Sequence, residues 1–126
     1  MEERRQYVRL DTTLTIRYRV LEEPPPSTAT QSLDIGGGGI RIFLKEPLKA
    51  DTSIELEIFL PEERTSIRCQ GKIVWVEEFS IYQPDTKIER KELEAGIEFT
   101  KISQEDRDRI VKHVILGYTP KRISNP

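Results

Sequence analysis

The chain has 126 residues and a formal net charge of −2 at pH 7, and this length fits one small domain with a single hydrophobic core. With this slight excess of acidic residues the chain has no global positive field to hold nucleic acid, so we expect no binding to DNA or RNA. No apolar run approaches the roughly 20 residues needed to cross a bilayer, which predicts no membrane span. Cys69 is the only cysteine and has no intrachain partner, so we expect a reduced, cytoplasmic setting.

Alternating apolar and polar residues predict β-strands through most of the first hundred residues. Between Leu14 and Val20 every second residue is apolar, which is typical of a strand with one buried face. Further strands are predicted at residues 29–35, 40–44, 54–60, 67–76 and 95–100. Gly71 indicates a bulge or bend within its strand. The proline-rich residues 22–28 are expected to form a loop, and so are the charged residues 79–92, with or without a short edge strand.

The end of the sequence predicts one helix. Ser103 is a typical N-cap, acidic residues follow it in the first turn, and Gly117 is a natural stop. A helix over residues 103–116 would place an apolar stripe against one end of a barrel. The fold class predicted is therefore mainly β: a small antiparallel barrel of six or seven strands with a C-terminal α-helix. We expect this domain to span residues 13–117, between a flexible arm at 1–12 and a tail at 118–126.

Two short motifs carry candidate functional residues. The first, R-Q-Y-V-R, places Arg5 and Arg9 four positions apart near the amino terminus. Guanidinium groups are planar, forked donors that suit phosphate oxygens and guanine edges. The second motif, D-I-G-G-G-G, places Asp34 beside Gly36 and Gly39 between two predicted strands. Glycine at such a bend lets a flat polar ligand approach the main chain closely.

Together these motifs resemble the bipartite signature of PilZ domains, R-x-x-x-R followed by D/N-x-S-x-x-G. The resemblance covers nearly the whole chain, since V-W-V at 74–76 and G-I-E-F at 96–99 follow in the family's order. PilZ domains are receptors for the bacterial second messenger cyclic di-GMP. The resemblance therefore implies a PilZ-like barrel that acts as a signalling receptor and adaptor. It implies ligand contacts from Arg4, Arg5, Arg9, Asp34, Gly36, Gly39 and Gly96.

One position departs from the family pattern. Gly36 stands where PilZ domains have a serine, so one hydroxyl near the ligand is missing. Ser32 lies two positions before Asp34, on the same face of a regular strand, and is a candidate replacement. The alternative function is a ligand-blind PilZ-like domain that acts only through protein–protein contacts. Simpler structural roles are a glycine turn with positive φ and Asp34 as a cap of that turn.

Nothing in the sequence predicts an enzyme. His113 is the only histidine, and no cluster of cysteine and histidine has the spacing of metal ligands, so we expect neither a metal site nor a cofactor. Trp75 and Phe99 are expected in the core. We expect a monomer or weak dimer that passes the ligand signal to an unidentified downstream protein.

Overall fold

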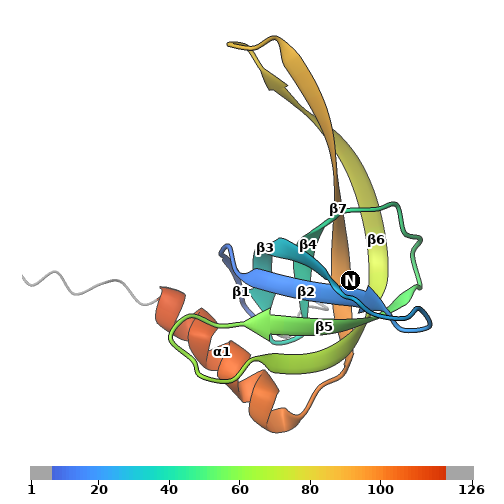
Figure 1. Ribbon diagram of the computed structural model, residues 1–126. Helices are drawn as coiled ribbons and strands as arrows, with labels where there is room; N and C mark the ends of the chain where they lie inside the picture. The colour runs from blue at the N-terminus through green and yellow to red at the C-terminus, as the bar shows by residue number, and fades with distance from the viewer. Residues whose placement is uncertain (1–6, 119–126) are drawn as a thin grey trace, which may run out of the picture.

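The computed structural model describes residues 7–118, which form a mainly β structure with one helix (Figure 1). The strands in chain order are β1 (Arg9–Asp11), β2 (Thr15–Val20), β3 (Thr28–Gly36), β4 (Gly39–Leu44), β5 (Ser53–Phe59), β6 (Ile67–Gln83) and β7 (Ile88–Lys101). The helix α1 (Gln104–Tyr118) follows the last strand. Within residues 7–118, no helix is long and apolar enough to cross a bilayer.

Six strands close into an antiparallel barrel in the order β3-β2-β5-β6-β7-β4, because β4 also pairs with β3. β1 adds a seventh strand beside the carboxyl-terminal half of β3, where Arg9 lies opposite Gly36 and Asp11 lies opposite Asp34. The predicted fold class is thus confirmed. Residues 9–11 of the predicted arm form a short strand, whereas residues 1–6 lie outside the described part of the chain. The flexibility of the arm stays a prediction.

The barrel interior is filled by the apolar residues of the alternating strands. Ile54, Leu56 and Ile58 on β5 are completely buried, as the period-two pattern predicts. Each such side chain contributes about 1.5–3 kcal/mol through burial. Tyr18 is also in this core, and its hydroxyl donates to Glu46 at 2.9 Å and accepts from the backbone N–H of Lys45 at 2.9 Å. These two bonds fix the loop after β4 to β2.

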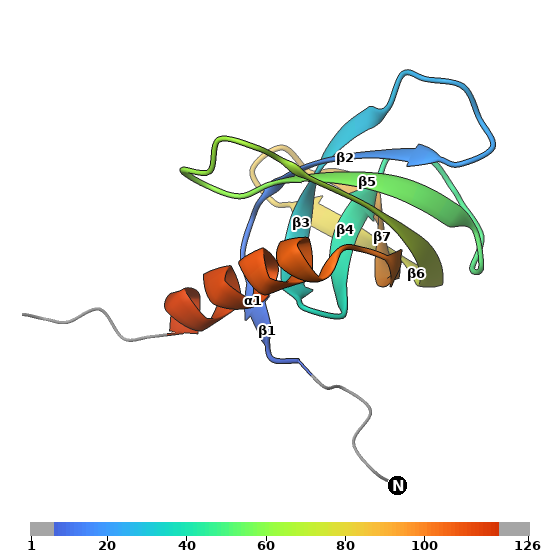
Figure 2. The same ribbon diagram turned by 90° about the horizontal axis from the view of Figure 1, so that it is seen from below.

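The helix covers one end of the barrel and lies beside β1 and β3 (Figure 2). Ser103 caps it as predicted, since its hydroxyl accepts the backbone N–H of Asp106 at 3.1 Å. Ile110 and Val114 are its buried residues. The helix continues through Gly117 to Tyr118, so glycine is not the stop here. A Cβ atom at 117 would lie 2.3 Å from a methyl carbon of Leu10, so glycine lets β1 approach the helix.

The segment 79–92 is not a loop. β6 and β7 continue past the barrel as a long two-stranded hairpin, which projects away from α1 in Figure 1. The loop prediction is wrong because a ribbon with two solvated faces shows no alternation of buried and exposed residues. The turn-forming residues are confined to the tip between Gln83 and Ile88, where Lys87 has a φ of 59°.

Candidate functional site

A bulge in β3 determines where Asp34 points. Ser32 pairs with Ile42 and Asp34 pairs with Arg41, so Leu33 is an extra residue at a shift in register. The bulge puts the two side chains on opposite faces. The Ser32 side chain is turned inward and 2% of the residue is exposed, while Asp34 lies on the outer face beside Arg41.

The suggestion that Ser32 replaces the missing hydroxyl is therefore wrong. Its hydroxyl accepts the backbone N–H of Leu14 at 2.8 Å and donates to the carbonyl of Thr12 at 2.7 Å. Ser32 thus fastens the segment between β1 and β2 to β3 and has no free hydroxyl to offer a ligand.

Asp34 lies between two arginines. Arg9 Nε donates to Asp34 Oδ1 at 3.0 Å, and Arg9 Nη2 contacts the same oxygen. Arg41 Nε donates to Asp34 Oδ2 at 3.0 Å, while Arg41 Nη1 donates to Glu94 Oε1 at 2.9 Å. Burial lowers the pKa of Arg41, but the attraction of Asp34 and Glu94 outweighs it and the net pKa is raised. This row of alternating charges fixes β1, β3, β4 and β7 to one another.

The glycine turn is shaped by close approach of backbones. None of the glycines among residues 7–118 has a positive φ, so the turn does not need the left-handed region. A Cβ atom on Gly36 would lie 2.7 Å from the carbonyl oxygen of Val8, and one on Gly39 would lie 2.2 Å from that of Ile97. Glycine at 36 therefore allows the arm to pass directly over the turn.

Trp75 lies over Gly96 at the base of the hairpin. The two residues pair across β6 and β7, and a Cβ atom at 96 would be 2.3 Å from the indole Nε1. Trp75 is 38% exposed, so its predicted core position is wrong, whereas Phe99 is buried as predicted. The cause is a second bulge at Val74, which changes the face on which the following residues lie.

The arm is also held by the helix. The guanidinium of Arg107 lies 5.6 Å from the ring centre of Tyr7, a cation–π contact, and donates to the carbonyl of Gly37 at 2.7 Å. The Tyr118 hydroxyl donates to the carbonyl of Arg9. Both ends of α1 therefore contact residues 7–9.

These groups surround one open hollow of about 800 Å³, within the usual range of small-molecule sites. It is lined by five of the predicted site residues, Arg9, Asp34, Gly36, Gly39 and Gly96. The predicted contacts Arg4 and Arg5 lie outside the described residues. The hollow combines guanidinium groups, a carboxylate, an indole and exposed backbone. This chemistry suits a flat, anionic heterocycle.

Sequence reasoning missed several residues of the hollow: Tyr7, Arg41, Val74, Trp75 and Arg107. The position of Arg41 could have been predicted, because a charged residue between Ile40 and Ile42 on a strand lies on the outer face. Arg107 had no signal in the sequence, since only the docking of α1 brings it to the glycine turn.

The described residues contain no group of histidine, cysteine and acidic side chains that could hold a metal ion. Cys69 is buried in the barrel, and its burial raises the pKa of the thiol to about 12. A thiol that stays protonated in this way is an apolar filler of the core.

The barrel and its hollow define a small β-barrel module with a polar, arginine-bearing candidate site. The sequence matches the PilZ domain model over residues 3–116, and the chain belongs to the PilZ domain family. No curated protein matches it in sequence.

Solved structures of PilZ proteins share the fold. MotI/DgrA, the Bacillus subtilis inhibitor of motility, is 25% identical with a TM-score of 0.71, and the match covers 96% of this chain and 54% of that one. The PilZ domain of Escherichia coli YcgR with c-di-GMP is 11% identical with a TM-score of 0.72, covering 90% and 91%. The K. pneumonia MrkH–c-di-GMP complex is 18% identical with a TM-score of 0.70, covering 90% and 51%. The chain thus spans about half the length of the MotI and MrkH chains.

Proposed function

We propose that this chain is a receptor for cyclic di-GMP and acts as a non-enzymatic signalling adaptor in the cytoplasm. The observation that carries the proposal is the placement of Asp34 between Arg9 and Arg41, at the edge of an open hollow. Two of the similar structures, YcgR and MrkH, are complexes with c-di-GMP, and this supports the choice of ligand.

The chemistry of the ligand fits the groups of the hollow. Cyclic di-GMP has two phosphates and two guanines. Arg9, with Arg5 from the arm, would donate to phosphate oxygens and to the O6/N7 edge of guanine. Asp34 would accept from guanine N1–H and N2–H, and Arg41 would keep that carboxylate oriented. The indole of Trp75 offers a flat surface on which a purine stacks.

On this proposal, Asp34 must exchange one of its hydrogen-bond partners when cyclic di-GMP binds. Asp34 is fully engaged by Arg9 and Arg41 without ligand, so guanine takes the place of one guanidinium, and Arg9 turns to phosphate or base. Residues 7–9 are held by Arg107 and Tyr118, and the exchange therefore changes the contact between arm and helix. This rearrangement is the signal that a downstream protein would detect.

Calorimetric titration of the full chain with cyclic di-GMP tests the proposal. Removing a charge-assisted contact costs about 1.5–3 kcal/mol, so Arg5→Ala, Arg9→Ala and Asp34→Ala should each weaken binding about ten- to 150-fold. Arg64→Ala is the control, since Arg64 is exposed and does not line the hollow. Cyclic di-AMP is the matched control ligand, because adenine lacks the O6 acceptor and the N2 donors.

Each outcome has a defined consequence. Absence of heat with the wild-type chain at tens of micromolar ligand would refute the receptor and leave the ligand-blind, protein-binding PilZ domain as the function. The departure at Gly36 is the observation that favours this alternative. Binding that ignores Arg9 and Asp34 would retain the receptor but refute the site.

A further inference from the structure

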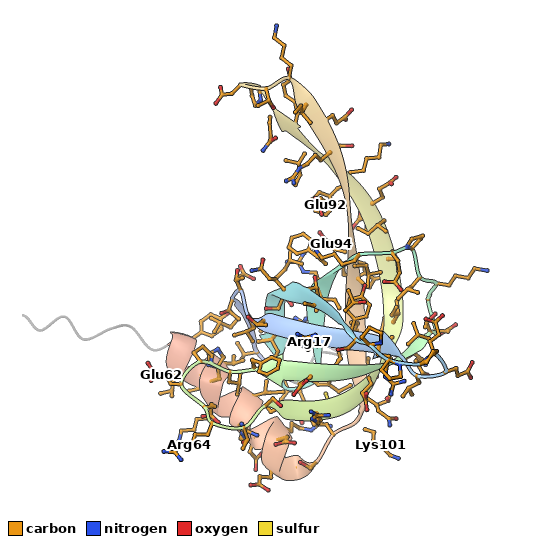
Figure 3. The ribbon with its side chains drawn as sticks, viewed as in Figure 1. Arg17, Glu62, Arg64, Glu92, Glu94 and Lys101 are labelled. Carbon is orange, nitrogen blue, oxygen red and sulfur yellow. The ribbon has the colours of Figure 1, made fainter. Side chains whose placement is uncertain are left out.

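The projecting hairpin leaves strand edges without a partner. β5 pairs with β6 only as far as Lys72, and β4 pairs with β7 only as far as Leu93. Beyond Ile73 and Leu93, each strand of the ribbon pairs only with the other strand within residues 7–118. An isolated two-stranded ribbon is marginally stable, and an open edge is a template for a further strand. Figure 3 shows the hairpin rising from the barrel, with Glu94 at its base and Glu92 above it. Near the base, the ring of Phe79 lies 6.4 Å from that of Phe43 on β4, measured between ring centres.

The orientation of the β6 backbone can be followed from its hydrogen bonds. Ile73 exchanges bonds with Asp51 and Thr52 on the side away from β7, at 2.7 and 2.9 Å. The bulge at Val74 then shifts the alternation by one residue. At the tip, the carbonyl of Gln83 faces β7, because it accepts the N–H of Lys87 at 2.7 Å. The residues whose N–H and C=O groups face the open edge are thus Val76, Glu78, Ser80 and Tyr82.

This β6 edge is complementary to itself. In an antiparallel pair of two β6 strands related by a two-fold axis at Phe79, each Phe79 faces the other and Val76 faces Tyr82. Glu78 then faces Ser80, and Glu77 faces Ile81, so no carboxylate opposes another. Tyr82 is 59% exposed in the single chain and would be covered.

Neighbouring registers are poorer. An axis at Glu78 would oppose two carboxylates. An axis at Ser80 would set Val76 against Pro84, which has no N–H to donate. The β7 edge is protected, because a central axis at Glu89, Arg90 or Lys91 would place that charged residue against its own copy.

We infer that the β6 edge docks a second copy of this chain. The two β6 strands pair antiparallel about Phe79, which forms a four-stranded ribbon with the barrels at opposite ends. A two-fold pairing of this kind closes on itself and cannot grow into a fibre.

The pairing also reaches the hollow. Trp75 lines the hollow, and in this register it lies opposite Gln83 of the second copy. The hairpin tip of one chain would therefore border the site of the other. If the hollow binds cyclic di-GMP, which rests on the function proposed above, ligand affinity and dimer affinity are coupled by the same factor in each direction.

Sedimentation equilibrium of the full, ligand-free chain tests the dimer independently of ligand binding. Ser80→Pro removes an N–H that faces the open edge and leaves the bonds between β6 and β7 in place. Two lost hydrogen bonds per dimer should weaken association by about tenfold or more. Ser80→Thr keeps the N–H and is the matched control, which should associate like the wild type. A wild-type chain that stays monomeric up to about 1 mM, or a Ser80→Pro variant of unchanged affinity and native circular dichroism, would overturn the inference.

Disulfide cross-linking tests the register. Facing residues that are not hydrogen-bonded have Cα atoms about 4.5 Å apart, within disulfide range. Phe79→Cys should therefore cross-link with itself, and Glu77→Cys should cross-link with Ile81→Cys when the two variants are mixed under oxidising conditions. Ile81→Cys alone is the control, since two copies of residue 81 are about 13 Å apart in this register. Equal self-cross-linking of Ile81→Cys, or none with Phe79→Cys, refutes the register.

Discussion

Replacing Gly36 by serine restores the family motif and sets two effects against each other. A Cβ atom at this position would lie 2.7 Å from the Val8 carbonyl oxygen and 3.1 Å from a side-chain carbon of Arg9. The first contact is with backbone, so the arm must move. Added atoms in a tight contact cost about 1–3 kcal/mol. The hydroxyl could return about 0.5–1.5 kcal/mol through one hydrogen bond to the ligand.

We therefore expect Gly36→Ser to lower the free energy of unfolding by about 1–3 kcal/mol and to bind cyclic di-GMP no more tightly than the wild type. Gly36→Ala is the matched variant, because it has the same Cβ without the hydroxyl. It should weaken binding, since Arg9 pairs directly with Gly36 and moves with the arm. The difference between the serine and alanine variants measures the hydroxyl alone.

Urea denaturation and calorimetric titration of the three proteins check this reasoning. An alanine variant as stable as the wild type would show that Val8 does not lie against Gly36. A serine variant that binds more tightly than the wild type would refute the balance of costs, and would mean that the arm leaves the turn when ligand binds.

Ser32→Ala should lower the free energy of unfolding by about 1–3 kcal/mol, because two buried hydrogen bonds are lost. Urea denaturation measures this, and a large loss of cyclic di-GMP affinity without loss of stability would contradict the structural role. The Cys69 thiol has its pKa raised from 9.0 to about 12, so the unfolded chain loses this proton at lower pH than the folded one. The free energy of unfolding should fall as pH rises above 9, and less so in Cys69→Ala; equal slopes would refute the shift. Trp75 is the only tryptophan, so cyclic di-GMP should change the fluorescence of the wild type. Gly96→Ala should shift the emission without ligand, since its methyl group displaces the indole, and an unchanged spectrum would refute that packing.

The barrel could be predicted from sequence because its strands have one buried face. Ile54, Leu56 and Ile58 mark that face directly, and Ser103 marks the start of the helix. The hairpin could not be predicted in this way. Its residues are solvated on both faces, so the pattern that reports burial is absent from 79–92 even though the strands continue.

Part of the lining of the hollow was predicted from the sequence, and the two wrong face assignments share a cause. The motif residues Arg9 and Asp34 do meet, at 3.0 Å. Ser32 and Trp75 were assigned to the wrong faces because each lies next to a bulge, and one inserted residue reverses the alternation that follows it. The alternation of apolar and polar residues can be recognised in a single sequence. The position of a bulge that interrupts it cannot be recognised reliably.

The two strands that form the base of the hollow are the same strands that form the hairpin, with no loop between the two parts. From Val74 to Gln83 an extended strand spans about 30 Å. Each degree by which the strand tilts at Trp75 therefore moves the tip by about 0.5 Å. β6 and β7 thus form one continuous arm whose short end lines the hollow and whose long end is the hairpin tip. A displacement too small to change any contact inside the barrel becomes, at Tyr82 and Ile88, a movement large enough to make or break a surface contact.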